Sequence, residues 1–512
     1  MDAIELTLFV KRINAICEEM GNVLMRTAFS PNIKDRLDFS CAIFDAGGQL
    51  CAQAAHIPVH LGSMAYAMAD IVNKINWQPG DMLILNDPYL GGTHLPDVTV
   101  IAPVFFEDKL HVFVANRAHH ADIGSSTPGS MPLANTLEEE GLVISPTIIM
   151  RNGKICREVL DNLLNSLHNP QIARPDFIAQ ISANKTGILR LTSLIELMGH
   201  SRFRIALDAL NNYAETMACS VLSDLPAGKY VYTDLMDDDG QGTIDIPIKA
   251  TVQINKEMII VDFTGTAPQS KGNINCPLSV AAAAVYYCFY CLMPPQTPAC
   301  AGAFRMISIT APEKCLVNSE YPAAVAAGNV ETSTRIVDVI LGALAQILPE
   351  KIPAASHGSM NNIAMGTSHW DYYETLGGGM GASYKTSGLS AIQTHMTNTL
   401  NTPIEILERY YPLRIRQYAI RHNSGGNGKN KGGDGLIREY EFLETGHVTL
   451  LTERRQHAPW GLADGEPGQT AVNMLNGTVV PGKTEFSVKT GDRLTIMTAG
   501  GGGWGKTVPG YE

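Results

Sequence analysis

Two features that would assign this chain to a class at once are missing from its sequence: an excess of positive charge and a long apolar segment. The 38 Lys and Arg residues are outnumbered by 50 Asp and Glu residues, which gives a formal net charge of −12. No basic cluster with interleaved aromatic residues occurs, so we expect no nucleic-acid partner. The longest apolar run, 278–293, is bounded by prolines and is shorter than the roughly 20 residues of a membrane-spanning helix. It predicts a buried helix, and we expect no membrane partner.

The sequence also lacks the marks of an exported, disulfide-bonded protein. Its first residues, MDAIE, contain neither the basic nor the apolar part of a signal peptide, so we expect a cytoplasmic protein. The ten cysteines are therefore expected to be reduced and mostly buried. Cys288 and Cys291 have C-x-x-C spacing but no second pair at the distance of a zinc ribbon, which favours a role in core packing.

A usable nucleotide-binding motif is missing as well. Residues 500–507, GGGGWGKT, match the letters of a P-loop. A working P-loop needs a helix after its Lys-Thr pair, because the helix N-terminus holds the phosphates. Only five residues follow, and they begin Val-Pro-Gly. No G-x-G-x-x-G sequence follows a strand in a βαβ setting. We therefore expect no nucleotide-binding residue in this chain.

The 512 residues, 45% of them hydrophobic, are sufficient for two or three domains with large cores. Apolar spacing predicts a helix over 4–28, strands near 38–45 and 49–53, a helix over 64–75, and mainly helices over 131–222. Short strands at 230–232, 244–254 and 258–263 follow. A helix from Gly328 to about Leu348 is next. Asn329, Thr332 and Ser333 could each cap it, and we expect Asn329 to do so because it directly follows the glycine. The 47 glycines gather in later loops, which points to a loop-built site.

We predict from this pattern an α+β fold in two parts. The N-terminal part, 1–222, is a mixed domain with a metal-bearing β-hairpin. The C-terminal part, 223–512, is a β-rich and helical region with glycine-rich loops, and it could be divided further near residue 320. The boundary follows the change from long helices to short strands.

The hairpin lies in the segment 81–130. Residues 98–106 and 110–115 predict two strands joined by a turn at 107–109. If the strands pair across that turn, residues near 95 lie opposite residues near 120, and His94, Asp97 and His119 meet at one end. Two imidazoles and a carboxylate that converge from loops on a stiff sheet predict a divalent metal site with an open coordination position.

Two acidic residues near the hairpin are open to two interpretations each. Asp38 leads into an apolar strand, where a carboxylate needs a partner. It is either a fourth metal ligand or the partner of Arg36 or Lys34 in a salt bridge. Asp87 precedes a proline and could simply form a turn.

His56 and His60 are four residues apart, but Pro58 lies between them. Proline interrupts a helix, so the two imidazoles cannot share one helical face as in zinc proteases. They could contact substrate or support the metal ligands, and a plain structural role is the alternative.

These segments together resemble the hydantoinase B/oxoprolinase family, and the match spans nearly the whole chain. The carriers are RLDFS at 36–40, HIPVHLGSM at 56–64, NDPYLGGTHLPD at 86–97, NRAHHADIG at 116–124, DFTGT at 262–266, GNVET at 328–332, SGGNG at 424–428 and GGGG at 500–503.

The resemblance implies a metal-dependent B-type subunit that works beside an A-type subunit. The A-type partner binds ATP and phosphorylates the substrate carbonyl or its enol. The B-type subunit then completes hydrolysis of a cyclic amide such as a hydantoin, 5-oxoproline or another lactam. Family members carry zinc or manganese on residues that match His94, Asp97, His119 and Asp38. The alternative branch comprises subunits of ketone carboxylases of the acetone and acetophenone type, and the length of this chain favours the hydrolases.

Neighbouring residues of the same motifs receive supporting roles. His120 and Asp122 could be the general acid and base or could hold the ligands, and His120 could instead only pack. Arg117 is predicted to contact substrate or to support the ligands, as are His56, His60 and Asp87. We expect a hetero-oligomer, and the rival hypothesis from another class is a scaffold that only stabilises its A-type partner.

Overall fold

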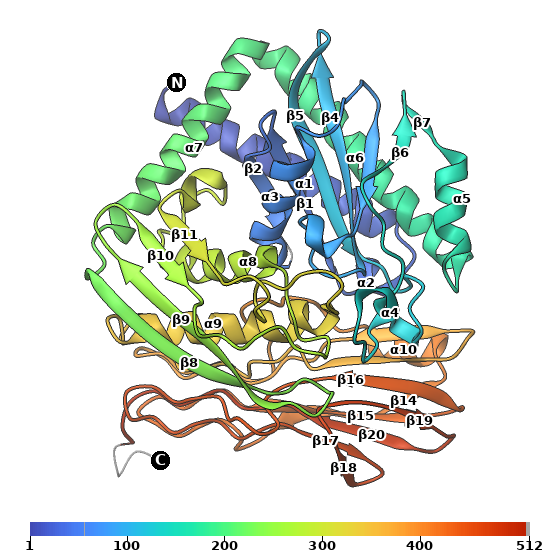
Figure 1. The fold of residues 1–512 in the computed structure, drawn as a ribbon, viewed down its shortest axis with the longest axis vertical. Helices are drawn as coiled ribbons and strands as arrows, with labels where there is room; N and C mark the ends of the chain where they lie inside the picture. Colours follow the sequence, from blue (N-terminus) through green and yellow to red (C-terminus); the bar gives the residue numbers. More distant parts are fainter. Residues whose placement is uncertain (56, 508–512) are drawn as a thin grey trace.

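A computed structural model of the chain describes residues 1–55 and 57–507. It has mixed helices and strands in several sheets, in agreement with an α+β fold. Figure 1 shows long helices and one large sheet at one end, a second sheet with two helices in the middle, and layered strands at the other end. The role predicted for His56 falls on a residue outside the described ranges.

The large sheet has seven antiparallel strands in the order β2-β1-β5-β4-β3-β6-β7. The predicted hairpin is confirmed: β4 and β5 are joined at Glu107 and Asp108, whose positive φ angles of 50° and 57° suit a two-residue hairpin turn. β5 is longer than predicted and ends at His119. The bounds are β1 Phe39–Asp45, β2 Leu50–Ala55, β3 Met82–Leu85, β4 Asp97–Phe106, β5 Lys109–His119, β6 Thr147–Arg151 and β7 Lys154–Ile155.

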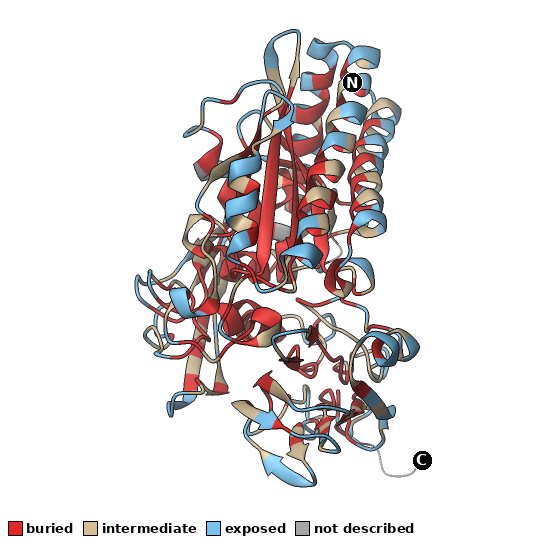
Figure 2. Cartoon of the chain, turned by 90° about the vertical axis from the view of Figure 1, so that its right-hand side faces the viewer, coloured by how far each residue is buried: buried red, intermediate tan, exposed pale blue. Residues whose placement is uncertain are grey.

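Helices cover both faces of this sheet. On one face lie α1 and α6, and α7 packs on both helices, while α3 lies on the other face. α1 buries residues spaced three and four apart, including Phe9, Ile13 and Met20, as its pattern predicted. Figure 2 shows the strands buried beneath helices whose outer faces are exposed. The bounds are α1 Ala3–Thr27, α2 Pro31–Lys34, α3 His60–Ile71, α4 Leu137–Glu140, α5 Arg157–Asn165, α6 Pro170–Met198 and α7 His200–Leu222.

The prediction that 131–222 is mainly helical was incomplete, because β6 and β7 extend the sheet there. β6 has the sequence TIIMR, and such a short apolar run does not distinguish a strand from part of a buried helix. α6 begins at Pro170, and a second proline, Pro175, lies inside it.

The middle of the molecule holds a four-stranded sheet in the order β11-β10-β9-β8. α9 packs on β8 and β9, and α8 packs on α9 and α3. The buried helix predicted in the apolar run is α8. The prediction that Asn329 caps the next helix is wrong, because Asn329 lies inside a π-helical turn, Gly328–Thr332, that precedes α9. The bounds are β8 Gly228–Asp238, β9 Ile244–Ile254, β10 Ile259–Asp262, β11 Ile307–Thr310, α8 Leu278–Tyr290 and α9 Ser333–Ala345.

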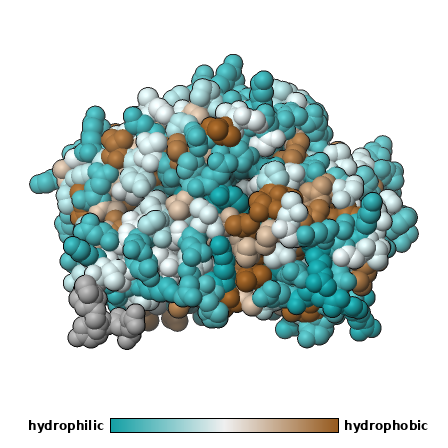
Figure 3. All heavy atoms as spheres, turned by 90° about the horizontal axis from the view of Figure 1, so that it is seen from below, coloured by the Kyte–Doolittle hydropathy of each residue, from teal (hydrophilic) through white to brown (hydrophobic). Residues whose placement is uncertain are grey.

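The C-terminal strands form two sheets, β13-β12-β16-β19 and β14-β15-β20-β17-β18, which enclose one apolar cluster that includes Met365, Leu450, Tyr440 and Ile496. Figure 3 shows the lower face of Figure 1, where these strands lie, as mainly hydrophilic with one apolar band. The bounds are β12 Asn362–Gly366, β13 Asp371–Glu374, α10 Ile404–Tyr410, β14 Leu413–Arg421, β15 Gly435–Phe442, β16 Gly446–Leu451, β17 Val472–Leu475, β18 Thr478–Val480, β19 Lys483–Val488 and β20 Arg493–Met497.

The glycines of this region pack backbone against backbone. A Cβ atom on Gly379 would stand 2.0 Å from the carbonyl oxygen of Gly433, and one on Gly501 would stand 2.1 Å from that of Met380. The Gly501 amide also donates a hydrogen bond to the Gly433 carbonyl. Segments without regular secondary structure, including 500–503, thereby lie in direct contact. These glycines serve close packing, which differs from the loop-built site that their number suggested.

One hydrophobic core continues across the predicted boundary near residue 223. It contains Ile13 and Val98 from the first part of the chain together with Val252 and Val337 from the second. The division at 223, and the further one near 320, therefore stay predictions. All ten cysteines are free, and seven of them are buried. No helix in the described parts of the chain combines the length and apolarity needed to cross a bilayer.

Candidate functional site

Three neighbouring strands of the large sheet bring acidic and imidazole side chains to one edge. Asp97 opens β4, His119 closes β5, and the two residues are direct partners in the ladder. Asp38 immediately precedes β1, whose first residue, Phe39, pairs with Ala118. Antiparallel pairing therefore places these three residues at the same end of β1, β5 and β4.

His94 and His60 complete the group. The ring centroids of His94 and His119 are 5.1 Å apart. The Oδ2 atom of Asp97 lies 3.4 Å from Nε2 of His94 and 3.4 Å from Nε2 of His60. All four side chains are buried. The hairpin thus brings His94, Asp97 and His119 together, and the start of α3 adds His60, which the sequence had suggested only as a supporting residue.

Several polar atoms at the centre of this group have no hydrogen-bond partner. They are Nε2 of His94, Nε2 of His119 and Oδ1 of Asp97. Buried polar atoms are rarely left unpaired, because each one loses its contacts with water without replacement. Imidazole nitrogens and carboxylate oxygens are the ligands that zinc and related divalent ions prefer. The donor set and its unsatisfied atoms therefore fit a metal ion.

The second ring nitrogen of each imidazole, Nδ1, contacts a neighbouring polar atom. Nδ1 of His94 is 3.3 Å from the carbonyl oxygen of Ala326, and Nδ1 of His60 is 2.9 Å from the Ser40 hydroxyl. Nδ1 of His119 is 3.2 Å from the side-chain nitrogen of Asn32. Such contacts orient metal-binding histidines in proteins, and here they leave Nε2 of each ring directed away from its support.

Burial and neighbouring charges shift the pKa values of two of these donors, His119 and Asp97. Burial lowers the pKa of His119 well below its ordinary value, and His94 lowers it further. Burial alone would raise the pKa of Asp97, but His94 and His60 hold it well below its ordinary value. His119 is therefore neutral and Asp97 is ionised near neutral pH, as ligation requires.

The two interpretations of Asp38 both remain open. Its Oδ2 atom is 3.9 Å from Nη2 of Arg36, which is a loose ion pair. Arg36 directs its hydrogen bonds to the carbonyl oxygen of Tyr373, at 3.0 Å, and to the Thr375 hydroxyl, at 3.1 Å. Burial raises the pKa of Asp38, and Arg36 opposes that shift.

A small cavity of about 20 Å³ opens beside these donors, with room for one water-sized group. Its far wall comes from the second half of the chain, which the sequence had not connected with the site. The Tyr373 ring is part of this wall and stacks on His119 with a centroid distance of 4.9 Å. The lining residues are Asp38, Ile57, Val59, His60, Asp97, His119, Asn329, Val330, Met360, Tyr373, Thr375, Thr397 and Thr399.

His120 and Asp122 do not face this cavity. Nε2 of His120 is 2.9 Å from the side-chain oxygen of Gln180 on α6, and its ring centroid lies 4.5 Å from that of Phe177. Asp122 accepts a hydrogen bond from the Asn169 amide at the start of α6. Both side chains thus join the sheet to a helix, and the catalytic roles suggested for them stay predictions.

Arg117 and Asp87 also make structural contacts. The buried guanidinium of Arg117 donates hydrogen bonds to the hydroxyls of Thr99 and Ser63, at 2.9 and 2.7 Å. Burial lowers the pKa of Arg117 to about 10. Asp87 accepts a hydrogen bond from the Tyr89 amide in a short 3-10 turn, as expected of a turn former. Arg117 braces the start of α3, and its predicted substrate contact stays untested.

Glu140 binds the backbone segment that contacts His94. Its Oε1 atom accepts hydrogen bonds from the amides of Val325 and Ala326, at 2.8 and 2.7 Å, and the Ala326 carbonyl contacts His94. The carboxyl is completely buried, and burial raises its pKa to about 8. Glu140 is therefore mostly protonated at neutral pH.

The raised pKa of Glu140 predicts a specific pH dependence of stability. Between pH 4.5 and about 8 the folded chain retains a proton that the unfolded chain loses, so the free energy of unfolding should fall as pH rises. The loss is at most about 1.4 kcal/mol per pH unit. Glu140→Gln removes this contribution, so the variant should gain stability relative to the parent between pH 5 and pH 8.

Urea unfolding at both pH values measures this effect. Glu158→Gln, at an exposed position, is the control and should follow the parent protein. A Glu140→Gln protein whose pH dependence runs parallel to that of the parent would contradict the assignment.

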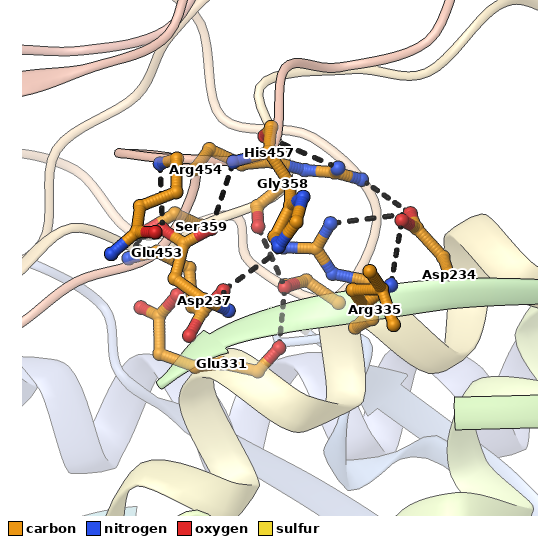
Figure 4. Close-up of polar contacts among 12 residues, drawn as sticks. Asp234, Asp237, Glu331, Arg335, Gly358, Ser359, Glu453, Arg454 and His457 are labelled. Carbon is orange, nitrogen blue, oxygen red and sulfur yellow. Dashed lines mark hydrogen bonds and ion pairs between the residues drawn. The ribbon is translucent and has the colours of Figure 1, made fainter. Parts of the chain in front are cut away.

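A second group of buried charges surrounds α9 (Figure 4). The Arg335 guanidinium pairs with Asp234 at 3.2 Å and with Glu453 at 3.1 Å. Arg454 pairs with Asp234 at 2.9 Å and with Asp338. These contacts join α9, which follows the π-helical turn, to β8 and to the segment after β16.

The sequence matches a protein-family model and several known proteins over nearly its whole length. The family model described as hydantoinase B/oxoprolinase matches residues 2–507. A 5-oxoprolinase of Arabidopsis thaliana is 39% identical over 99% of this chain, which covers 42% of that protein. The putative B-type subunit of a D-/L-hydantoinase from Pseudomonas is 32% identical over 99% of this chain and 90% of its own length. The chain thus spans less than half of the 5-oxoprolinase and nearly all of the hydantoinase subunit.

Solved structures share the fold over its full extent. A chain of the ATP-dependent caprolactamase from Pseudomonas jessenii superposes with a TM-score of 0.91 and 26% identity, covering 99% of this chain and 91% of that one. An acetone carboxylase chain superposes with a TM-score of 0.87 at 17% identity, covering 98% and 76%. The second likeness concerns the fold alone.

Proposed function

Because this chain belongs to the hydantoinase B/oxoprolinase family, we propose that it completes the ATP-dependent hydrolysis of a cyclic amide. The proposal is carried by the group of buried, unpartnered donors at the end of the β4–β5 hairpin. It is supported by the activities for which the relatives are named, which include 5-oxoprolinase, hydantoinase and caprolactamase. The substrate class is a hydantoin, 5-oxoproline or another lactam.

The proposed cofactor is a divalent ion, zinc or manganese, held by His94, Asp97 and His119 with Asp38 or His60 as a further ligand. Two ligand atoms on one tetrahedral ion are about 3.3–3.4 Å apart when each bond is about 2.0–2.1 Å. The two Nε2 distances from Asp97, both 3.4 Å, match that separation. No group of three such side chains within 1–55 and 57–507 already forms a finished metal site. We therefore expect small rotations to close the group around the ion.

The chain's own residues have defined tasks in this reaction. When bound, the ion supplies Lewis acidity and lowers the pKa of water to about 7. Neutral His119 and ionised Asp97 keep the donor set ready near neutral pH. The tight walls of the cavity exclude bulk water, which strengthens electrostatic interactions inside it. One water adds its oxygen to the carbon of the phosphorylated carbonyl and the C–N bond breaks, with its electron pair going to the nitrogen, which takes up a proton. A second water then cleaves the resulting acyl phosphate, which releases phosphate and leaves a carboxylate.

The proposed partner is an A-type subunit that binds ATP and phosphorylates the substrate carbonyl. An unactivated lactam resists hydrolysis at neutral pH, and phosphorylation makes C–N cleavage favourable. One relative is named as the B-type subunit of a hydantoinase, which implies a companion subunit. The 5-oxoprolinase relative is more than twice as long as the matched region, which suits a fused partner. We therefore propose a hetero-oligomer for this chain.

An assay of the assembled complex tests the function. The chain is co-purified with its A-type partner, and ADP release is measured with hydantoin, 5-oxoproline and caprolactam, and separately with acetone plus bicarbonate. We expect ADP release and ring opening with at least one cyclic amide. Turnover with ketone and bicarbonate alone would assign the chain to the carboxylase branch. Full activity of a metal-free complex would favour the scaffold hypothesis.

A further inference from the structure

The π-helical turn Gly328–Thr332 is held in one conformation against the site. A Cβ atom on Gly328 would stand 1.7 Å from the carbonyl oxygen of Asn275, so only glycine allows this approach. The Ser333 hydroxyl donates a hydrogen bond to the Asn329 carbonyl, and the Thr332 hydroxyl donates one to the Ile274 carbonyl. π-Helical turns inside helices occur frequently at functional sites. The turn therefore presents Asn329 to the cavity from a rigid support.

One polar atom of the Asn329 side chain has a hydrogen-bond partner, and the other has none. It is 3% exposed and lines the cavity. Its Nδ2 atom lies 3.4 Å from Oδ2 of Asp97, and its Oδ1 atom has no hydrogen-bond partner. The reverse orientation of the amide would bring two oxygens together beside an ionised carboxylate. The cavity therefore contains a fixed hydrogen-bond acceptor next to the proposed metal ligands.

The rest of the far wall is uncharged. The hydroxyl groups of Thr375 and Thr399 are hydrogen-bonded to each other at 2.6 Å. Ile57, Val59 and Met360 supply apolar surface. Neither Lys nor Arg occurs among the described residues that line the cavity. Such a wall suits a neutral group that has one hydrogen-bond donor and an apolar remainder.

We infer that Asn329 Oδ1 accepts a hydrogen bond from the ring N–H beside the carbonyl that is cleaved. This inference rests on the proposed function and restricts the other lactams of its substrate class to rings that carry an N–H, as hydantoin and 5-oxoproline do. The cavity itself, about 20 Å³, opens to solvent, so only the edge of a ring lies inside it. The amide edge of a small ring enters beside Asn329, and its methylene groups lie along the apolar wall near the opening. An N-methyl group would replace the donor and leave the acceptor buried and unpaired, which sites built for an N–H reject strongly.

A binding experiment tests the inference without ATP or a partner. The purified full chain, loaded with zinc, is titrated with 2-pyrrolidinone and with N-methyl-2-pyrrolidinone, and binding is followed by saturation-transfer NMR. We expect the parent protein to bind the N–H ring at least about tenfold more tightly. Asn329→Ala should abolish that preference by weakening the N–H ring alone. Asn212→Ala, the same change at an exposed position on α7, should preserve it.

The outcomes separate this inference from the function on which it rests. Equal binding of the two rings by the parent protein, or no measurable binding of either, overturns the inference without any variant. An equal loss for both rings in Asn329→Ala also overturns it, because the residue would then act on water or on packing. If the preference is observed but no cyclic amide supports ADP release by the complex, the proposed function fails and the inference stands. If cyclic amides turn over but the preference for the N–H ring is absent, the inference fails and the proposed function stands.

Discussion

Replacing His119 by Ala is expected to reduce bound divalent metal from about one ion per chain to less than about a tenth of that. Hydrolysis of a cyclic amide by the assembled complex should fall by roughly a thousandfold or more, because water and carbonyl then lose their Lewis acid. His119 is the partner of Asp97 in the ladder, and its Nε2 atom is buried without a hydrogen-bond partner. His94→Ala should behave in the same way.

The measurement is metal content by mass spectrometry after dialysis, followed by turnover of the reconstituted complex. His111→Ala is the matched control, since His111 lies near the other end of the same strand, β5, and is only partly buried. It should retain metal and activity. Undiminished metal content in both the His94 and His119 variants would remove the proposed site.

Arg454→Met is expected to cause the largest loss of stability, about 3–5 kcal/mol. Arg454 is completely buried and pairs with both Asp234 and Asp338. Its removal leaves two carboxylates without this cation in a poorly solvated interior, although Arg335 still contacts Asp234. The cost arises from the uncompensated charges more than from any net gain of the original ion pairs.

Chemical denaturation of Arg454→Met and of the parent protein measures this loss. Arg493→Met is the control, because Arg493 is about half exposed and its contact with Glu439 is 3.8 Å long. A surface change of this kind should stay within about 0.5 kcal/mol. A similar small effect for Arg454→Met would show that the buried charges contribute little to folding.

The hairpin and its metal-site candidates could be predicted because their signals are local. Two apolar runs flank a short polar turn, and antiparallel pairing across such a turn fixes which residues face each other. Asp97 and His119 are therefore partners. The end of β5 was missed because Asn116 and Arg117 resemble loop residues. In the fold they are buried and bonded, Asn116 to α6 and Arg117 to Thr99 and Ser63.

The far wall of the site could not be predicted, because it depends on contacts between distant parts of the chain. Tyr373 stacks on His119 although more than 250 residues separate them in sequence. Asn329 was expected to cap a helix, since Asn after Gly commonly does so. Its side chain instead contacts Asp97 because the turn before α9 is π-helical. The sequence did show a polar residue beside a glycine in an apolar segment. Where the side chain of that residue points depends on tertiary packing, which the sequence pattern does not specify.

Tertiary packing also decided the places of His60 and His120, of which one lies in the candidate site and the other does not. His60 lies beside Asp97 because α3 starts at the edge of the sheet. No local sequence pattern specifies that position. His120 follows a predicted ligand directly, yet it contacts Phe177 and Gln180 on α6. Successive side chains in an extended segment point to opposite faces, and this alternation argues against shared roles for adjacent histidines.

Anomalous X-ray diffraction from crystals of the chain loaded with zinc or manganese is the most direct measurement of the proposed metal centre. The proposal predicts one strong peak about 2.0–2.2 Å from Nε2 of His94, Nε2 of His119 and the Asp97 carboxylate. A peak elsewhere in the molecule, or none at that position in protein that supports metal-dependent turnover, would contradict it.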